Sequence, residues 1–246
     1  MKTYFAEKLG VSPDRIYTVS VMPCVAKKGE REMELYYGEY AGHDIDAVLT
    51  TRELARMIRM AYIKPESLED IESDCPMQAG TGAGVIFGAT GGVMEAALRS
   101  AYYLIKGVNP PADAFVNVRS QGFNENDGVQ EAEFKIDDIT VRTAVVSGLG
   151  NTRNLLKKIE RGEVSYDFVE VMACPGGCVG GGGQPIHDGE ELAFERGKKL
   201  YALDESFELR FSHENPDILS LYDEYFEKPN SHKAHMLLHT EHAVNR

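Results

Sequence analysis

Short apolar, β-branched runs alternate along the chain with segments of helical periodicity. The apolar runs predict four strands, at residues 15–22, 44–49, 140–146 and 166–172. A fifth run at 134–136 precedes Asp137–Asp138 and predicts a hairpin with the third of these strands. Helices are predicted to begin after Thr50 or Thr51 and to cover 91–104, 151–158, 217–226 and 234–239. Strands that alternate with helices predict an α/β fold.

Two connecting segments divide this pattern. Residues 106–115 (KGVNPPADAF) contain two adjacent prolines after a predicted helix, and we predict a boundary between two lobes there. Residues 65–74 form a polar, acidic connection that leads into a glycine-rich turn at 80–84. The chain is therefore expected to fold as two lobes, without internal repeats.

Composition narrows the classes of function. The chain has 246 residues and a formal net charge of −13, which argues against binding to nucleic acid or anionic membranes. No apolar run approaches the roughly 18–20 residues of a membrane span, and the opening residues lack the hydrophobic stretch of a secretion signal. We expect a cytoplasmic protein with no nucleic-acid partner and no membrane span, whose charged residues outside the motifs below lie on the solvated surface.

The cysteines carry the clearest chemical signal. Four cysteines are too few for a disulfide scaffold in a chain of this length, which favours metal binding or burial. Cys174 and Cys178 lie on a Cys-Pro-Gly-Gly-Cys loop after the strand predicted at 166–172. Two thiols at this spacing can converge on one metal centre, and the glycines of 176–183 allow close approach of the backbone. Two buried cysteines beside a flexible loop are the alternative, but packing alone does not explain so many glycines.

A further cysteine, Cys24, follows the strand predicted at 15–22 and is close in sequence to Lys27 and Lys28. Nearby lysines stabilise a thiolate, which suits iron in a cluster, whereas a lysine-rich surface turn is the alternative. With the other two motif cysteines it makes three thiolates, an incomplete set for a four-iron cluster. Cys75 lies in an acidic segment unlike either motif, so we interpret it as an incidental thiol rather than the fourth ligand.

The glycine-rich stretch at 81–97 invites a nucleotide-binding interpretation. It lacks the Gly-Lys-Ser/Thr ending of a phosphate-binding loop and the acidic partner of a dinucleotide site. The stretch is more consistent with a tight backbone packed against a bulky cofactor.

Three segments taken together resemble the catalytic domain of the iron-only ([FeFe]) hydrogenases. They are MPCVAKKGE at 22–30, TGAGVIFGATGGVMEAALRSA at 81–101 and EVMACPGGCVGGGGQP at 170–185. The similarity runs over nearly the whole chain and is that of the C-terminal part of the domain, with residues 205–246 resembling a helical, small-subunit-like tail.

The resemblance implies an H-cluster, in which a [4Fe-4S] cluster is linked through a cysteine sulfur to a binuclear [2Fe] subcluster bearing CO, cyanide (CN) and a bridging dithiolate. By position, Cys24 and Cys174 resemble ligands of the four-iron cluster, and Cys178 resembles the ligand that bridges it to the two-iron site. Lys27 resembles the residue that donates a hydrogen bond to a cyanide, and Glu30 the outer carboxylate of the proton path. The residues that resemble the lining of the two-iron pocket are Met22, Pro23, Phe87, Gly88 and Met172.

The activity implied by the resemblance is the reversible oxidation of H₂ and reduction of protons. The implied fold has two lobes with mixed or parallel sheets flanked by helices, and an active site in the cleft between the lobes. The implied partners are an electron carrier such as ferredoxin or NAD(P)H-oxidising subunits, together with hydrogenase maturation proteins.

One departure from the family pattern bears on activity. The family's Thr-Ser-Cys-Cys-Pro motif, which supplies the fourth ligand of the four-iron cluster and a proton-passing cysteine, does not occur in these residues. We therefore expect that this chain alone does not assemble an active H-cluster, and that the N-terminus is incomplete, which leaves a periplasmic location open. Evolution of H₂ from reduced viologen by the isolated, matured chain would contradict the first expectation.

Three alternatives stay open at this point. Hydrogenase-like proteins of cytosolic iron–sulfur assembly keep the cysteine loop but tend to lose the side chains around the two-iron site, which this chain retains as Met22, Lys27, Glu30 and Met172. A sensory hydrogenase-like protein differs mainly in the motif that does not occur here. A zinc-binding or interaction module would use the same three motif cysteines, and would contain zinc without a chromophore.

Overall fold

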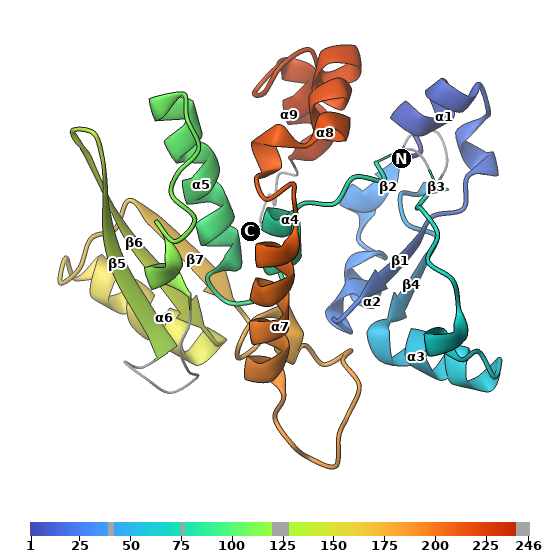
Figure 1. Ribbon diagram of the computed structural model, residues 1–246, viewed down its shortest axis with the longest axis horizontal. Coiled ribbons are helices and arrows are strands. Elements are labelled where there is room, and N and C mark those ends of the chain that lie inside the picture. Colours follow the sequence, from blue (N-terminus) through green and yellow to red (C-terminus); the bar gives the residue numbers. More distant parts are fainter. Residues whose placement is uncertain (39–41, 75–76, 120–127, 240–246) are drawn as a thin grey trace. The chain divides into compact units, whose positions relative to one another are not determined.

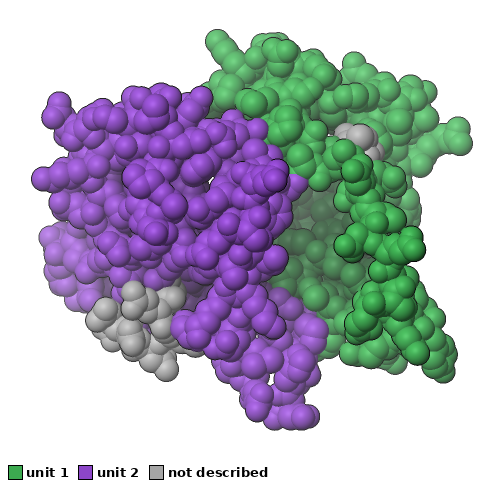
Figure 2. Space-filling model, in the orientation of Figure 1, with its two compact units in different colours: residues 1–79, 215–246 green, residues 80–214 purple. Residues whose placement is uncertain are grey.

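The computed structural model describes residues 1–38, 42–74, 77–119 and 128–239 (Figure 1). The chain divides into two compact units, which Figure 2 shows in different colours. Unit 1 comprises Met1–Ala79 and Asn215–Arg246, and unit 2 comprises Gly80–Glu214. The segment at 106–115, where we predicted a boundary, lies inside unit 2, and Phe115 is 4% exposed in the core of that unit.

Unit 1 contains a small parallel sheet with helices from both parts of the chain. Its elements are α1 (Tyr4–Leu9), β1 (Val19–Met22), α2 (Ala26–Glu30), β2 (Tyr37–Gly38), β3 (Gly42–His43), β4 (Ala47–Thr50), α3 (Thr51–Met60), α8 (Pro216–Leu221) and α9 (His232–Leu238). Strands β1 and β4 pair in parallel, with Val19 opposite Ala47 and Met22 opposite Thr50. Strands β2 and β3 form a separate antiparallel pair.

The sequence predicted that α3 begins after Thr50 or Thr51, and Thr50 is its N-cap, in a capping box with Glu53. The Thr50 hydroxyl accepts a hydrogen bond from the Glu53 N–H at 3.1 Å, and the Thr50 N–H donates to the Glu53 carboxylate at 2.8 Å. Lys28 contributes a further hydrogen bond to Glu53 at 2.6 Å. The hydrogen bond from Lys28, followed by those from Thr50, lowers the pKa of Glu53 to about 2.

Unit 2 is built around a three-stranded mixed sheet. Its main elements are α4 (Gly82–Ile86), α5 (Gly92–Lys106), β5 (Val129–Ile136), β6 (Ile139–Ser147), α6 (Leu149–Glu160), β7 (Phe168–Met172) and α7 (Ala193–Ser206). The strand order is β5–β6–β7, with β5 antiparallel and β7 parallel to β6. The predicted hairpin is confirmed, since Ile136 pairs with Ile139 across its turn.

The two faces of this sheet carry separate apolar clusters (Figure 1). On one face, Ile136 and Val145 pack against Met94 and Leu98 of α5. On the other face, Ala144 and Val146 pack with Leu155 of α6. The alternation along β6 is the two-residue period of a strand buried on both sides, as expected for a sheet between two helical layers.

Both cysteine motifs follow the carboxyl end of a parallel strand. In unit 1, β1 ends at Met22 and is followed by Pro23 and Cys24. In unit 2, β7 ends at Met172 and is followed by the loop that begins at Cys174. Ligand sites of open α/β sheets form at this edge, because loops from neighbouring strands meet there.

The described parts of the chain contain no helix that is both long enough and apolar enough to cross a membrane.

Candidate functional site

The cysteine loop of unit 2, residues 174–178, has a backbone that only its glycines allow. Gly176 and Gly177 have φ of 80° and 93°, in the left-handed region that side chains disfavour. The Gly177 N–H donates to the Cys174 carbonyl oxygen at 3.0 Å and closes a tight turn. The Gly176 N–H donates to Ser147 Oγ, also at 3.0 Å, which joins the loop to the end of β6.

The loop also packs against the turn at 88–90, between α4 and α5. The Thr90 N–H donates to the Gly176 carbonyl oxygen at 3.1 Å, and the Val179 N–H donates to the Gly88 carbonyl oxygen at 2.9 Å. A Cβ atom at Gly177 would lie 2.8 Å from both Gly88 O and Thr90 N, so no larger residue fits without backbone movement. The backbones of the glycine-rich stretch and the cysteine loop are therefore closely packed against each other.

Five predicted site residues lie on these two loops or directly beside them. Cys174 and Met172 are partly buried, and Cys178 is exposed. Phe87 is 45% exposed at the end of α4, next to Gly88. Neither cysteine is in a disulfide bond.

The other five predicted residues lie in unit 1, on one strand–turn–helix segment. Met22, Pro23 and Cys24 leave β1, and Lys27 and Glu30 lie on α2. The residues of this segment that line a cavity of about 110 Å³ are Met22, Lys27 and Glu30.

Lys27 and Glu30 form an ion pair, with Lys27 Nζ 2.6 Å from Glu30 Oε2. The Tyr36 hydroxyl donates to Glu30 Oε1 at 3.1 Å. Tyr36 also lines the cavity. It was not predicted as a site residue, because it belongs to neither cysteine motif. The hydrogen bond with Glu30 raises the pKa of Lys27 above 10.5.

The stability contributed by the Lys27–Glu30 pair is expected to depend on pH. Because the Lys27 pKa is raised in the folded state, the pair stabilises the fold fully below the ordinary pKa of 10.5 and loses that contribution as pH rises through the raised value. Glu30→Gln is expected to lower the Lys27 pKa, measured by NMR titration of the lysine side chain. Glu32→Gln is the matched control, since Glu32 pairs with Arg31 instead. A Lys27 pKa that is the same in both variants would contradict the assignment.

The predicted ligands are divided between the units: Cys24 belongs to unit 1, whereas Cys174 and Cys178 belong to unit 2. Among the described residues, no three His, Cys, Asp or Glu side chains gather as a metal site. Cys75, which we interpreted as incidental, lies outside the described residues. The set of cluster ligands therefore remains a prediction.

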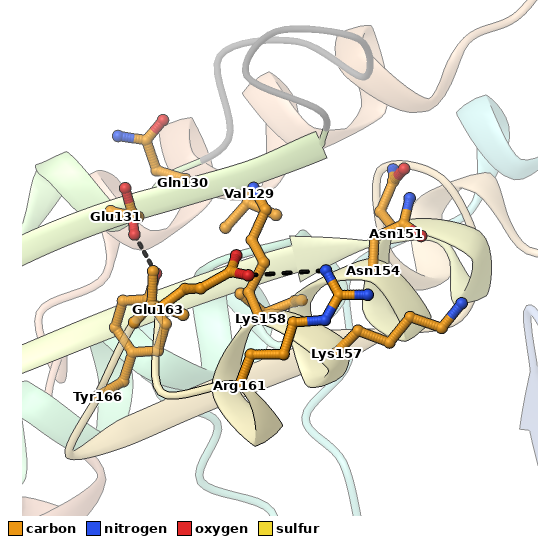
Figure 3. Close-up of a pocket in the computed structure, with 12 residues that line it drawn as sticks. Val129, Gln130, Glu131, Asn151, Asn154, Lys157, Lys158, Arg161, Glu163 and Tyr166 are labelled. Carbon is orange, nitrogen blue, oxygen red and sulfur yellow. Dashed lines mark hydrogen bonds and ion pairs between the residues drawn. The ribbon is translucent and has the colours of Figure 1, made fainter.

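A groove of about 830 Å³ beside α6 contains none of the predicted site residues (Figure 3). Its basic lining comes from Lys157, Lys158 and Arg161 near the C-terminal end of α6. Cations at this end of a helix interact favourably with the helix dipole. A structural role accounts for these three residues.

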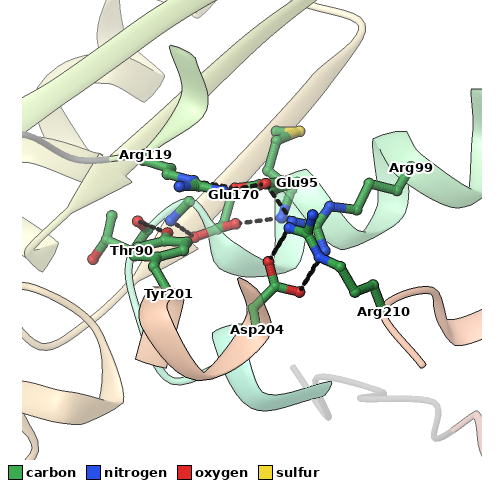
Figure 4. A network of polar contacts seen from close by, with 10 residues as sticks. Thr90, Glu95, Arg99, Arg119, Glu170, Tyr201, Asp204 and Arg210 are labelled. Atoms are coloured by element: carbon green, nitrogen blue, oxygen red, sulfur yellow. Dashed lines mark hydrogen bonds and ion pairs between the residues drawn. The ribbon is translucent and has the colours of Figure 1, made fainter. Parts of the chain in front are cut away.

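A buried network of charged residues occupies the centre of unit 2 (Figure 4). Arg99 donates to Glu95 at 2.7 Å and to both carboxylate oxygens of Asp204 at 2.8 and 2.7 Å. Arg119 also pairs with Glu95, and Arg210 with Asp204. The expectation that charged residues outside the motifs lie on the surface is wrong here, because Glu95, Arg99 and Asp204 are at most 2% exposed. The i, i+4 spacing of Glu95 and Arg99 on α5 was the one signal for it.

The electrostatics of this network are set by its arginines. Burial opposes ionisation of Asp204, but hydrogen bonds from Arg99 and Arg210 outweigh it and lower the Asp204 pKa. Asp204 also fills the space beside Gly82, where a Cβ atom would lie 2.2 Å from Asp204 Oδ1. The network thus links α5 to α7, and Asp204 packs closely against α4 at Gly82.

Glu170 joins β7 to the start of α5. Its two carboxylate oxygens accept the Gly91 and Met94 N–H groups, each at 2.6 Å. Burial raises the pKa of Glu170, and the two backbone donors oppose that shift. The carboxylate satisfies N–H groups at the beginning of a helix, and it ties the strand that leads to Cys174 to the turn at 88–90.

These residues fit an iron–sulfur cluster. The predicted donors are thiols, which suit iron, and they follow strand ends where loops converge. The glycines of the cysteine loop let its backbone pack directly against the turn at 88–90, since a Cβ at Gly177 would lie 2.8 Å from Gly88 O and Thr90 N. Thr90 Oγ1 is buried and has no hydrogen-bond partner in the described parts of the chain, so a donor is left over close to this loop.

The family profile for the iron only hydrogenase large subunit, C-terminal domain, matches residues 1–182. The chain belongs to the iron-only hydrogenase family. The resemblance drawn from the sequence is therefore confirmed. A second profile, for the iron hydrogenase small subunit, matches residues 190–244 of this family member.

Several curated proteins are similar to this chain of the iron-only hydrogenase family. The NADP-reducing hydrogenase subunit HndD of Solidesulfovibrio fructosivorans is 46% identical over 98% of the chain and 40% of its own length. Iron hydrogenase 1 of Clostridium pasteurianum is 44% identical over 97% of the chain and 41% of its own length. The chain thus spans well under half the length of these two relatives. Cytosolic iron–sulfur assembly component 3 of Mus musculus is 32% identical over 100% of the chain and 52% of its own length.

Solved structures of the family agree with the fold. A variant of the [FeFe]-hydrogenase HydA1 from Chlamydomonas reinhardtii matches with a TM-score of 0.78 and 41% identity, over 98% of this chain and 66% of that one. The predicted α/β class, with small mixed and parallel sheets and helices, is confirmed.

Proposed function

We propose that this chain is the C-terminal part of an H-cluster-binding domain, in a protein that catalyses the reversible oxidation of H₂ and reduction of protons. The observation that carries the proposal is the cysteine loop of residues 174–178, held by Ser147 on one side and by the turn at 88–90 on the other. This arrangement fixes two thiol-bearing residues at the carboxyl edge of a parallel strand pair, inside a chain of the hydrogenase family.

Cys24 and Cys174 would hold the [4Fe-4S] cluster, and Cys178 would bridge it to the [2Fe] subcluster with its CO, CN and dithiolate ligands. When bound, the H-cluster supplies the redox chemistry of H₂. The backbone of the cysteine loop orients the thiols, because each loop glycine is tied by a hydrogen bond or by close contact to a neighbouring element. The side chains proposed to line the two-iron pocket are Met22, Pro23, Phe87, Gly88 and Met172.

Lys27 and Glu30 are proposed as the polar residues of the reaction. The Lys27 ammonium donates charge-assisted hydrogen bonds, which suit an anionic ligand such as cyanide. Its contact with Glu30 at 2.6 Å places a proton-accepting carboxylate within direct reach of that ammonium. Tyr36 holds the Glu30 carboxylate by a second hydrogen bond, so that Glu30 is oriented as an outer carrier of protons.

The proposed partners are an electron carrier, either ferredoxin or NAD(P)H-oxidising subunits, and hydrogenase maturation proteins. The NADP-reducing name of the HndD relative supports a nicotinamide-linked chain of electron transfer. We propose a cytoplasmic location. Cell fractionation tests it, since the periplasmic [Fe] hydrogenase large subunit of Nitratidesulfovibrio vulgaris is also a relative, at 45% identity over 82% of this chain.

The cluster proposal is tested by reconstitution. The anaerobically purified chain is incubated with ferrous iron, sulfide and 2-mercaptoethanol, which can supply a thiolate where the chain supplies three. We expect a brown chromophore with about four iron and four sulfide per chain. Bound zinc without a chromophore, in a chain offered both metals, would show that the site is a zinc module instead.

A second candidate function is a role in iron–sulfur protein assembly without turnover of H₂. It is favoured by the mouse assembly component, which is similar over the whole of this chain. The two functions differ in the two-iron site. After co-expression with maturation proteins, infrared bands of bound CO and CN are expected for the hydrogenase, whereas a [4Fe-4S] cluster without those bands would favour the assembly function.

A further inference from the structure

Thr90 has a buried hydroxyl that the protein does not use. The residue is 3% exposed, and its Oγ1 atom has no hydrogen-bond partner in the described parts of the chain. A buried hydroxyl without a partner loses its hydrogen bonds to water and gains none in return. Such a group calls for a specific explanation, because nearly all buried polar side chains in folded proteins are satisfied.

The backbone of Thr90 is held on two sides. Its N–H donates to the Gly176 carbonyl oxygen at 3.1 Å, in the middle of the cysteine loop. Its carbonyl oxygen accepts a hydrogen bond from the Tyr201 hydroxyl of α7 at 3.5 Å. The backbone of Thr90 is thus fixed between the cysteine loop and α7.

The neighbouring charge network does not use the Thr90 hydroxyl. Both oxygens of Glu170 accept backbone N–H groups, and Glu95 and Asp204 are paired with arginines (Figure 4). The cysteine loop is a direct neighbour of this residue, since the Thr90 N atom lies only 2.8 Å from the position of a Cβ at Gly177.

We propose that the Thr90 hydroxyl donates a hydrogen bond to sulfur of the cluster bound at this loop, either a cysteine thiolate or a cluster sulfide. The inference rests on the proposed function. It extends that function to a residue that tunes the reduction potential of the cluster through a hydrogen bond. Anionic sulfur is an acceptor that a hydroxyl satisfies well, and hydrogen bonds to sulfur favour the more negative, reduced cluster. Thr90 therefore raises the reduction potential of the cluster.

The test compares four variants of the full chain, each reconstituted with iron, sulfide and 2-mercaptoethanol. Thr90→Val keeps the shape of the side chain without the hydroxyl, Thr90→Ala removes hydroxyl and methyl together, and Thr90→Ser keeps the hydroxyl. Thr18→Val is the matched control, because Thr18 Oγ1 is the other described hydroxyl that is buried without a partner, and it lies in unit 1 before β1. Iron and sulfide content report assembly, and an EPR-monitored redox titration reports the potential.

We expect a lower reduction potential in Thr90→Val and Thr90→Ala than in the unsubstituted chain, with Thr90→Ser and Thr18→Val close to it. Pulsed EPR in H₂O and D₂O should also show an exchangeable proton near the cluster that the valine and alanine variants lack. If the valine and alanine variants fail to retain a cluster while the serine variant retains one, that result also supports the proposal, because only the variants without the hydroxyl lose the cluster.

Two results separate this inference from the proposed function. A full cluster with an unchanged or higher potential in Thr90→Val and Thr90→Ala overturns the role of Thr90 and leaves the proposed function standing; a buried water would then satisfy the hydroxyl. Failure of the unsubstituted chain to bind any iron–sulfur cluster overturns the proposed function, and this inference with it.

Discussion

Cys174→Ala is expected to reduce the cluster iron and sulfide of the reconstituted chain to background. Cys174 leaves β7 at the start of the loop, and its carbonyl oxygen closes the turn by accepting the Gly177 N–H at 3.0 Å. The substitution keeps that backbone contact and removes only the thiol. A cluster that has lost a protein thiolate exchanges its iron with solution, because the remaining ligands are too few to retain it.

The matched control is Cys75→Ala, which removes a thiol outside both motifs. It is expected to leave iron, sulfide and the visible chromophore unchanged. The measurements are iron and acid-labile sulfide per chain, together with the absorbance spectrum. A Cys174→Ala chain that retains a full cluster, or a Cys75→Ala chain that loses it, would show that the ligand assignment is wrong.

The second large effect is expected from Arg99→Met, which we predict to destabilise unit 2 by about 3–5 kcal/mol. Arg99 is the shared partner of Glu95 and Asp204, which are 1% and 0% exposed. Methionine fills a similar volume but carries no charge. Two buried carboxylates then keep only their outer arginines, and the loss of a partner from a buried ion pair costs much more than an exposed pair contributes.

Urea unfolding followed by circular dichroism measures this effect. Lys106→Met is the control on the same helix, since its pair with Asp137 is solvated, with exposed fractions of 34% and 50%. A loss of about 0–1 kcal/mol is expected there. Equal losses in the two variants would mean that the buried network does not hold α5 to α7.

Local signals in the sequence predicted the elements well. The hairpin of β5 and β6 was visible because two apolar runs flank Asp137–Asp138, and Asp137 takes a positive φ of 54° at the turn. The start of α3 was visible because threonine is a preferred N-cap residue, and Thr50 occupies that position. Strand β1 is shorter than the predicted 15–22, covering only Val19–Met22, because its pairing partner β4 begins at Ala47, opposite Val19.

The site was predictable only in part. Each cysteine motif is a contiguous segment of the chain, so its residues and their spacing alone predict metal binding by its cysteines. Glu170 gave no comparable signal, because its partners at Gly91 and Met94 are more than seventy residues away, with separations of 79 and 76. The roles of Ser147 and Thr90 likewise depend on contacts between loops that are distant in sequence.

The hydrogen bonds of the cysteine loop have a consequence for how a cofactor enters. Zinc fingers and many small metal domains gain their structure from the metal, because nothing else orders their ligands. Here the loop is anchored by Ser147, Gly88 and Thr90, contacts that belong to the protein itself. The entropy of arranging the loop is thus lost during folding rather than at metal binding. Under the proposed function, the folded chain would accept the cluster on a loop that is already ordered, rather than fold around it.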